Sequence, residues 1–169
     1  MSEWFNEVKE NALMILKDQK YLKPTAIVLY ENEQVMNIFE FPYKNEEERT
    51  KYLHFINSFC KENKAEKVVV ICGVVARDFE RKDVDYVMNN LETENPLMYP
   101  ESMVKKAIAF YNIDFKDNNN TFLHLVFYHF AGDFLECESY EIRDGLGLIK
   151  DVDGLGNGMM IVSEHLLMI

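Results

Sequence analysis

The run "KVVVICGVV", from Lys67 to Val75, places the strongest constraint on the fold. It is rich in β-branched valine, contains no proline and has a single charged residue, at its start. Such a continuous apolar run is typical of an interior strand that is buried on both faces. The rest of the chain must therefore supply elements that cover it. Because a helix is expected just before this run, we expect the strand to lie parallel to one strand of the preceding hairpin.

Two segments have the apolar spacing of amphipathic helices. Residues 2–20 form the first, and Pro24 marks its boundary. Residues 45–64 form the second, with Asn45 as the expected N-cap and Glu48 as the residue that reaches back to it. The expected buried stripes are Trp4, Phe5, Val8, Ala12, Ile15 and Leu16 in the first helix, and Tyr52, Phe55, Ile56, Phe59 and Cys60 in the second.

The remaining apolar runs predict strands that are mostly antiparallel. Thr25 to Tyr30 and Gln34 to Phe41 flank a short polar turn and predict a hairpin. The runs "KAIAFYNIDF", "TFLHLVFYHF" and "FLECESYEI" predict a three-stranded meander, with the second run central. Residues 77–100 are irregular and predict a long surface connection. We therefore expect one α+β domain over residues 1–169, with a mixed, largely antiparallel sheet of about five to seven strands and two main helices packed on it.

The tetrad Asp-Gly-Leu-Gly occurs twice, beginning at Asp144 and at Asp153. Gly154, Gly156 and Gly158 are the candidate cofactor-binding residues, but the lysine and hydroxyl residue of a phosphate loop do not follow them. The stretch also lacks the acidic ligands that a calcium loop needs at its fifth and twelfth positions. Asp-Gly favours tight turns, so we interpret the stretch as a short strand between two turns and predict no cofactor. The apolar end "MMIVSEHLLMI" should then pack into the sheet or at an interface between copies.

Carboxylates are the only candidates for catalysis or metal binding. Glu136 and Glu138 lie two residues apart on a predicted strand, so they share a face at about 7 Å, a separation that acid–base pairs use. The same pattern is typical of a solvated strand face, with Leu135 and Cys137 turned inward.

Asp78, Asp83 and Asp85 are the candidate metal ligands, in a segment that is also typical of a solvated loop. His124 and His129 lie five apart on one predicted strand, so they point to opposite faces.

Charge and cysteine content exclude several classes of protein. The net charge is −11, which opposes direct binding to nucleic acid. Such a charge is typical of an ordinary soluble surface, and it also suits a basic protein partner. The three cysteines, Cys60, Cys72 and Cys137, are widely spaced and form no zinc or disulfide pattern. The start of the chain lacks the basic and apolar regions of a signal peptide. No apolar run is close to the length of a membrane helix, which needs about 18 residues. We expect a cytoplasmic protein with no membrane contact.

Three functions remain open. The acidic balance, the absence of a catalytic motif and the apolar end favour a binding module with a regulatory or inhibitory effect on a protein partner. Association with other copies of the chain, through its apolar end or through a sheet edge, is a further expectation. One alternative is a hydrolase that uses the carboxylates named above, which requires a pocket where they meet a histidine. The other is a decoy that mimics nucleic acid, which requires the acids on one face.

Overall fold

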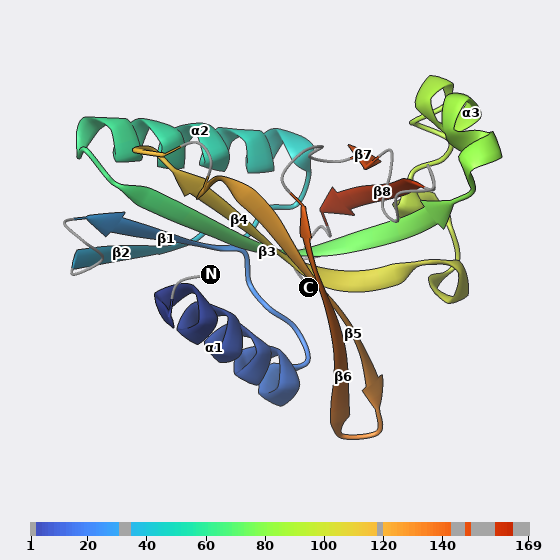
Figure 1. Cartoon of the computed structure of the whole chain (residues 1–169), viewed down its shortest axis with the longest axis horizontal. Coiled ribbons are helices and arrows are strands. Elements are labelled where there is room, and N and C mark those ends of the chain that lie inside the picture. Colours follow the sequence, from blue (N-terminus) through green and yellow to red (C-terminus); the bar gives the residue numbers. More distant parts are fainter. Residues whose placement is uncertain (1–2, 31–34, 118–119, 143–147, 150–157, 164–169) are drawn as a thin grey trace.

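The sheet is built on β3 (Lys67–Phe79), in a computed structural model that describes residues 3–30, 35–117, 120–142, 148–149 and 158–163. Two long helices pack on opposite faces of this sheet (Figure 1). The other elements are α1 (Glu3–Gln19), β1 (Thr25–Tyr30), β2 (Val35–Glu40), α2 (Glu46–Glu62), η2 (Arg81–Asp83), α3 (Val84–Asn89), η3 (Pro96–Met98), η4 (Glu101–Met103), β4 (Lys105–Asp114), β5 (Phe122–Ala131), β6 (Phe134–Ile142), β7 (Leu148–Ile149) and β8 (Gly158–Ser163).

The strand order is β2-β1-β3-β4-β5-β6, with β8 also paired to β3 and β7 paired to β8. β3 extends beyond Val75 because it has two successive partners on one edge. Its residues 67–71 pair with β1 and its residues 74–79 pair with β8, while β4 runs along the opposite edge. The predicted α+β class with a largely antiparallel sheet is confirmed. The expected parallel neighbour of β3 is wrong, since both β1 and β4 pair with it antiparallel.

α1 covers one face of the sheet because its apolar side chains recur on one stripe. Phe5, Val8, Ala12 and Leu16 are buried against the odd-numbered side of β3 and the strands beside it. Ile15, expected in this stripe, is 43% exposed. It lies at the flank of the stripe, where the sheet no longer covers the helix.

α2 covers the other face, and its start follows the predicted capping pattern with one change. The Glu48 N–H donates to Asn45 Oδ1 at 2.9 Å, as expected of an N-cap. The Glu48 carboxylate reaches back to the N–H of Lys44, at 2.8 Å, rather than to that of Asn45. The predicted stripe is too wide, because Ile56 and Cys60 are buried whereas Phe55 is 55% exposed.

The chain's last described strand supports the expectation for its apolar end. β8 pairs with β3, and Met159 and Met160 are buried. The two residues of β7 pair with β8, so the short strand predicted between the Asp-Gly turns is confirmed. Residues 150–157 and 164–169 lie outside the described residues, and so does the stretch 143–147.

Candidate functional site

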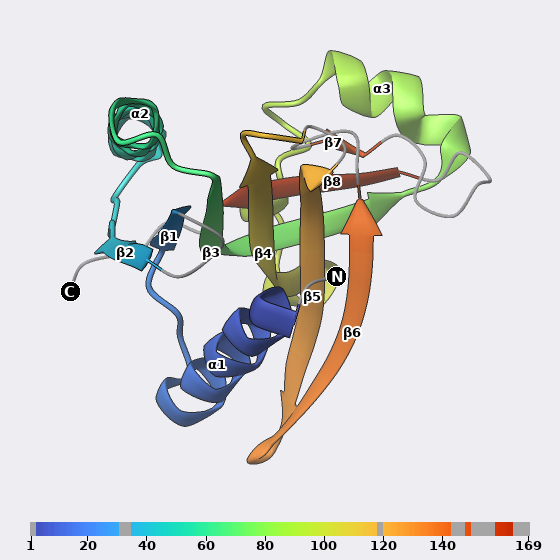
Figure 2. The same ribbon diagram turned by 60° about the vertical axis from the view of Figure 1, so that its left-hand side comes forward.

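The carboxylates predicted on the meander lie on the exposed β5–β6 hairpin. Glu136 is opposite His129 and Glu138 is opposite Phe127, so both carboxylates share a face, as predicted. Glu136 Oε2 lies 2.8 Å from His129 Nε2, and both side chains are more than half exposed. Cys137, expected to turn inward, is exposed on the opposite face. The structure therefore joins one candidate carboxylate to a histidine, on an arm of the sheet that extends away from its centre (Figure 2).

The three candidate metal ligands do not form one cluster. Asp78 Oδ2 accepts from Lys105 Nζ at 2.6 Å, in an exposed ion pair. Asp83 ends η2, and Asp85 lies in the first turn of α3. Among the residues that the structure describes, no group of three or more histidine, cysteine or acidic side chains is arranged to hold a metal ion.

Only one of the three candidate glycines, Gly158, lies within the described residues. Gly154 and Gly156 lie outside the described residues. Gly158 begins β8, where it is paired with Phe79 of β3. Its backbone is therefore part of the sheet ladder.

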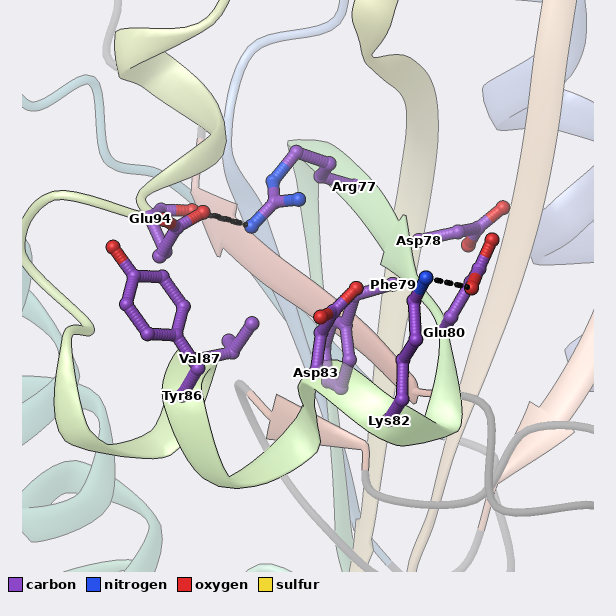
Figure 3. Close-up of a pocket in the computed structure, with 9 residues that line it drawn as sticks. All are labelled: Arg77, Asp78, Phe79, Glu80, Lys82, Asp83, Tyr86, Val87 and Glu94. Carbon is purple, nitrogen blue, oxygen red and sulfur yellow. Dashed lines mark hydrogen bonds and ion pairs between the residues drawn. The ribbon is translucent and has the colours of Figure 1, made fainter.

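A pocket of about 410 Å³ opens between the end of β3 and the segment that follows it (Figure 3). We call residues 80–104 the connecting segment; it contains η2, α3, η3 and η4. The described residues that line the pocket are Arg77, Asp78, Phe79, Glu80, Lys82, Asp83, Tyr86, Val87 and Glu94. These residues include no histidine, cysteine, serine or threonine. The pocket lining therefore offers carboxylates but no histidine to work with them, and the His129–Glu136 pair is not part of it.

Arg77 holds the connecting segment against the sheet. Its Nη2 lies 2.5 Å from Glu94 Oε2, and both side chains are only 14% exposed. The Tyr99 hydroxyl donates to the same carboxylate oxygen, and the Arg77 guanidinium lies 4.4 Å from the centre of the Tyr99 ring. The hydrogen bond to Glu94 raises the pKa of Tyr99. One cation on β3 therefore fixes two points of the segment, Glu94 and Tyr99.

The connecting segment also exposes an unusual share of apolar surface. Six of the fifteen large apolar side chains that are exposed in the described part of the chain come from residues 86–103. They are Tyr86, Met88, Leu91, Leu97, Met98 and Met103, with Met98 the most exposed at 73%. We call these six residues the apolar set. The segment lies at one end of the molecule, beyond β3 and β8 (Figures 1 and 2).

Sequence reasoning predicted a surface connection here, but missed both the pocket and the apolar set. Arg77 and Glu94 are 17 positions apart, and the segment between them is irregular. No periodic sequence pattern therefore predicts their contact. The composition did carry an indication, since methionine, leucine and tyrosine recur among the charges of this segment. Interpreting it as a binding surface required knowing that these side chains have no place in the core.

His124 is the one buried histidine among the described residues. It is 4% exposed on the face covered by α1, where its ring lies 5.6 Å from that of Phe5 and 6.1 Å from that of Phe110. Neither ring nitrogen has a hydrogen-bond partner among the described residues. Burial lowers its pKa, the nearby Lys9 lowers it further, and Glu141 acts in the opposite direction. His124 is therefore a neutral core residue at neutral pH.

Comparison with known proteins identifies no relative: no protein-family model, curated protein or solved structure matches the chain significantly. No helix in the described part of the chain is both long and apolar enough to span a bilayer. The role of this chain has therefore to be argued from its own residues.

Proposed function

We propose that this chain binds another protein through the connecting segment and acts as a regulatory or inhibitory module. The observation that carries the proposal is the concentration of the apolar set within residues 86–103. Scattered apolar side chains are ordinary on a protein surface, but a concentration of them from one segment is typical of an interaction site. Three of the six are methionines, whose flexible side chains adapt to a partner surface.

The charges beside the apolar set indicate the kind of partner. Asp83, Asp85, Glu92 and Glu101 are all exposed within the connecting segment. Arg81 and Lys82 are its only basic residues before Lys105. An acidic surface with apolar anchors favours a basic protein segment that carries apolar side chains of its own. Opposite charge would speed the encounter, and burial of the apolar set would supply affinity.

The anchoring of the segment supports a binding role because it limits the conformational entropy lost on association. Arg77 ties Glu94 and Tyr99 to the sheet, and Val87 and Pro96 of the same segment are buried. The surface is thus held in place before a partner arrives. A hydrolase would instead need its carboxylates and histidine to meet in one pocket, and the described pocket lining contains no histidine.

The cellular location is part of the same proposal. Cys60, Cys72 and Cys137 form no disulfide, and the first two are buried. Cysteines without disulfides are typical of proteins in a reducing compartment. We place the interaction in the cytoplasm on that basis.

The test is affinity capture from cell extract with three tagged chains: wild type, Met98→Lys and Met14→Lys. Met14 on α1 is 62% exposed, so it gives a matched substitution on a surface outside the connecting segment. We expect a partner that wild type and Met14→Lys retain and that Met98→Lys loses, because a lysine opposes a basic partner. Raised salt should weaken the capture. Equal capture by all three chains would exclude this surface, and capture of nothing by wild type would count against the binding function itself.

A further inference from the structure

The outer edge of β2 presents backbone groups that no described strand satisfies. β2 pairs with β1 along its whole length and is the terminal strand of the sheet (Figure 1). The Phe41 N–H donates to the Pro24 carbonyl at 2.9 Å, which marks 24 and 41 as a hydrogen-bonded pair. Such pairs alternate along an antiparallel ladder, so Phe39, Asn37 and Val35 turn their backbone groups toward β1. Met36, Ile38 and Glu40 therefore turn theirs toward the open edge.

This edge has few of the devices that usually prevent strands from pairing. Natural edge strands carry lysine, proline or a bulge, or are short and covered. β2 reads VMNIFE, with neither lysine nor proline, and its ladder with β1 contains no bulge. Its one charged residue, Glu40, stands at the end of the strand. Ile38, at the centre of the strand, is a large apolar side chain that is 59% exposed. An exposed apolar edge strand of this kind is complementary to another strand.

We propose that two copies of this chain pair through their β2 strands, antiparallel, about a two-fold axis at Ile38. The three residues whose backbone groups face the open edge are spaced symmetrically about Ile38. In this register Ile38 lies opposite Ile38 of the partner subunit, and Met36 lies opposite Glu40 of the partner subunit. All three positions then exchange N–H···O bonds, which gives about six hydrogen bonds across the axis.

The side chains at the edge favour a second copy over an unrelated strand. The axis brings one exposed isoleucine onto another, so both are removed from water by a single contact. Glu40 is displaced from Glu40 of the partner subunit, so the register avoids a like-charge pair. Glu40 Oε2 also lies 3.7 Å from Lys23 Nζ on its own chain. The edge is thus locally balanced, although the chain carries a net charge of −11.

The first test is sedimentation velocity over a concentration series. Wild type is expected to sediment as a dimer, and Ile38→Lys as a monomer, because two lysines would meet at the axis. Met14→Lys, an equal charge change on the exposed side of α1, should remain a dimer. A wild-type chain that is monomeric at every concentration, or an Ile38→Lys chain that still dimerises, would overturn the proposal.

A second test uses a disulfide across the proposed interface and introduces no charged residue there. In a Cys137→Ser background, Ile38→Cys should form an intermolecular disulfide on mild oxidation, since Cα atoms of a hydrogen-bonded pair lie about 5.5 Å apart. Met14→Cys in the same background should remain monomeric on a non-reducing gel. Equal cross-linking of both variants, or none at position 38, would contradict the register. Dimers that persist without cross-linking at 38 would indicate another interface, and a β2 edge that instead captures a foreign extended peptide would also exclude the second copy.

Discussion

Arg77 and Glu94 form a largely buried ion pair that joins β3 to the connecting segment, with 2.5 Å between Nη2 and Oε2. The same carboxylate accepts a hydrogen bond from Tyr99, so three side chains depend on one charge. Removing either charge leaves the other with little access to water. The position of the connecting segment therefore depends on this pair more than on any exposed ion pair nearby.

Replacing Glu94 with glutamine should lower the free energy of unfolding by about 3 kcal/mol, because Arg77 is then left without a buried counter-charge. The connecting segment should also become more sensitive to limited proteolysis, since its link to β3 is weakened. Urea unfolding measures the first effect and mass mapping of the fragments measures the second. Glu92→Gln, an exposed neighbour, is the matched control and should change neither. Equal behaviour of the two variants would show that the ion pair does not hold the segment.

Phe5 should be the main anchor of α1. Its ring packs edge-on against Phe110, Phe122 and His124, and it is 2% exposed. Phe5→Ala should therefore lower the free energy of unfolding by about 3–4 kcal/mol, through lost burial and the cavity that remains. Met14→Ala on the exposed side of the same helix should change it by less than about 0.5 kcal/mol. Denaturant unfolding compares the two, and a small loss for Phe5→Ala would mean that α1 contributes little to stability.

The thiols should divide into one accessible and two protected groups. Cys137 is exposed, whereas Cys60 and Cys72 are buried. Burial raises the pKa of Cys60 to about 11, so its reactive thiolate is scarce at neutral pH. A chromogenic thiol reagent should label one cysteine per native chain, and all three after unfolding. Cys137→Ser should abolish the native reaction. Rapid labelling of more than one thiol in the native chain would contradict the described packing.

The pH dependence of Cys137 labelling should depend on the pKa of its thiol. Partial burial raises its pKa, and the nearby Lys9 opposes that effect. The rate of labelling should therefore keep rising with pH beyond the range in which an unperturbed thiol levels off. A rate that levels off at lower pH would show that Lys9 dominates.

The sequence predicted the elements well because the strongest patterns are local. The valine run of β3 needs no knowledge of its neighbours to indicate burial on both faces, and Ala26, Val69 and Val74 are fully buried at the centre of the sheet. The N-cap of α2 was predicted for the same reason, since Asn45 and Glu48 are three residues apart. The bounds of α1 and α2 followed from apolar spacing and from capping and proline signals, whereas the extension of β3 from Val75 to Phe79 did not.

Contacts between distant residues could not be predicted in the same way. Phe55 has the spacing of a buried residue, but α2 lies over the edge of the sheet, where Phe39 meets it edge-on and leaves it half exposed. The sharing of one edge of β3 by β1 and β8 depends on the register of pairing, which the sequence pattern does not specify. The pocket depends likewise on the path of the connecting segment, and that path is set by Arg77 and Glu94.

His124 should make the stability of the chain depend on pH. Burial holds its pKa below the 6.5 of an ordinary histidine, and Lys9 lowers it further. In the unfolded chain the same side chain takes up a proton near pH 6.5, so below that pH the unfolded state binds more protons than the native state. Its contribution to stability is therefore complete above pH 6.5 and is lost as the pH falls toward the native pKa.

The measurement is the free energy of unfolding between about pH 7 and pH 5, for wild type and for His124→Phe. The variant keeps an aromatic ring between Phe5 and Phe110 but cannot take up a proton, so its stability should fall less steeply with decreasing pH. The difference between the two slopes removes the contribution of the carboxylates, which titrate in both chains. His129→Asn is the control, because His129 is exposed on the opposite face and should leave most of the wild-type slope in place. Identical slopes for wild type and His124→Phe would show that His124 titrates alike in the native and unfolded chains. That result would contradict the prediction.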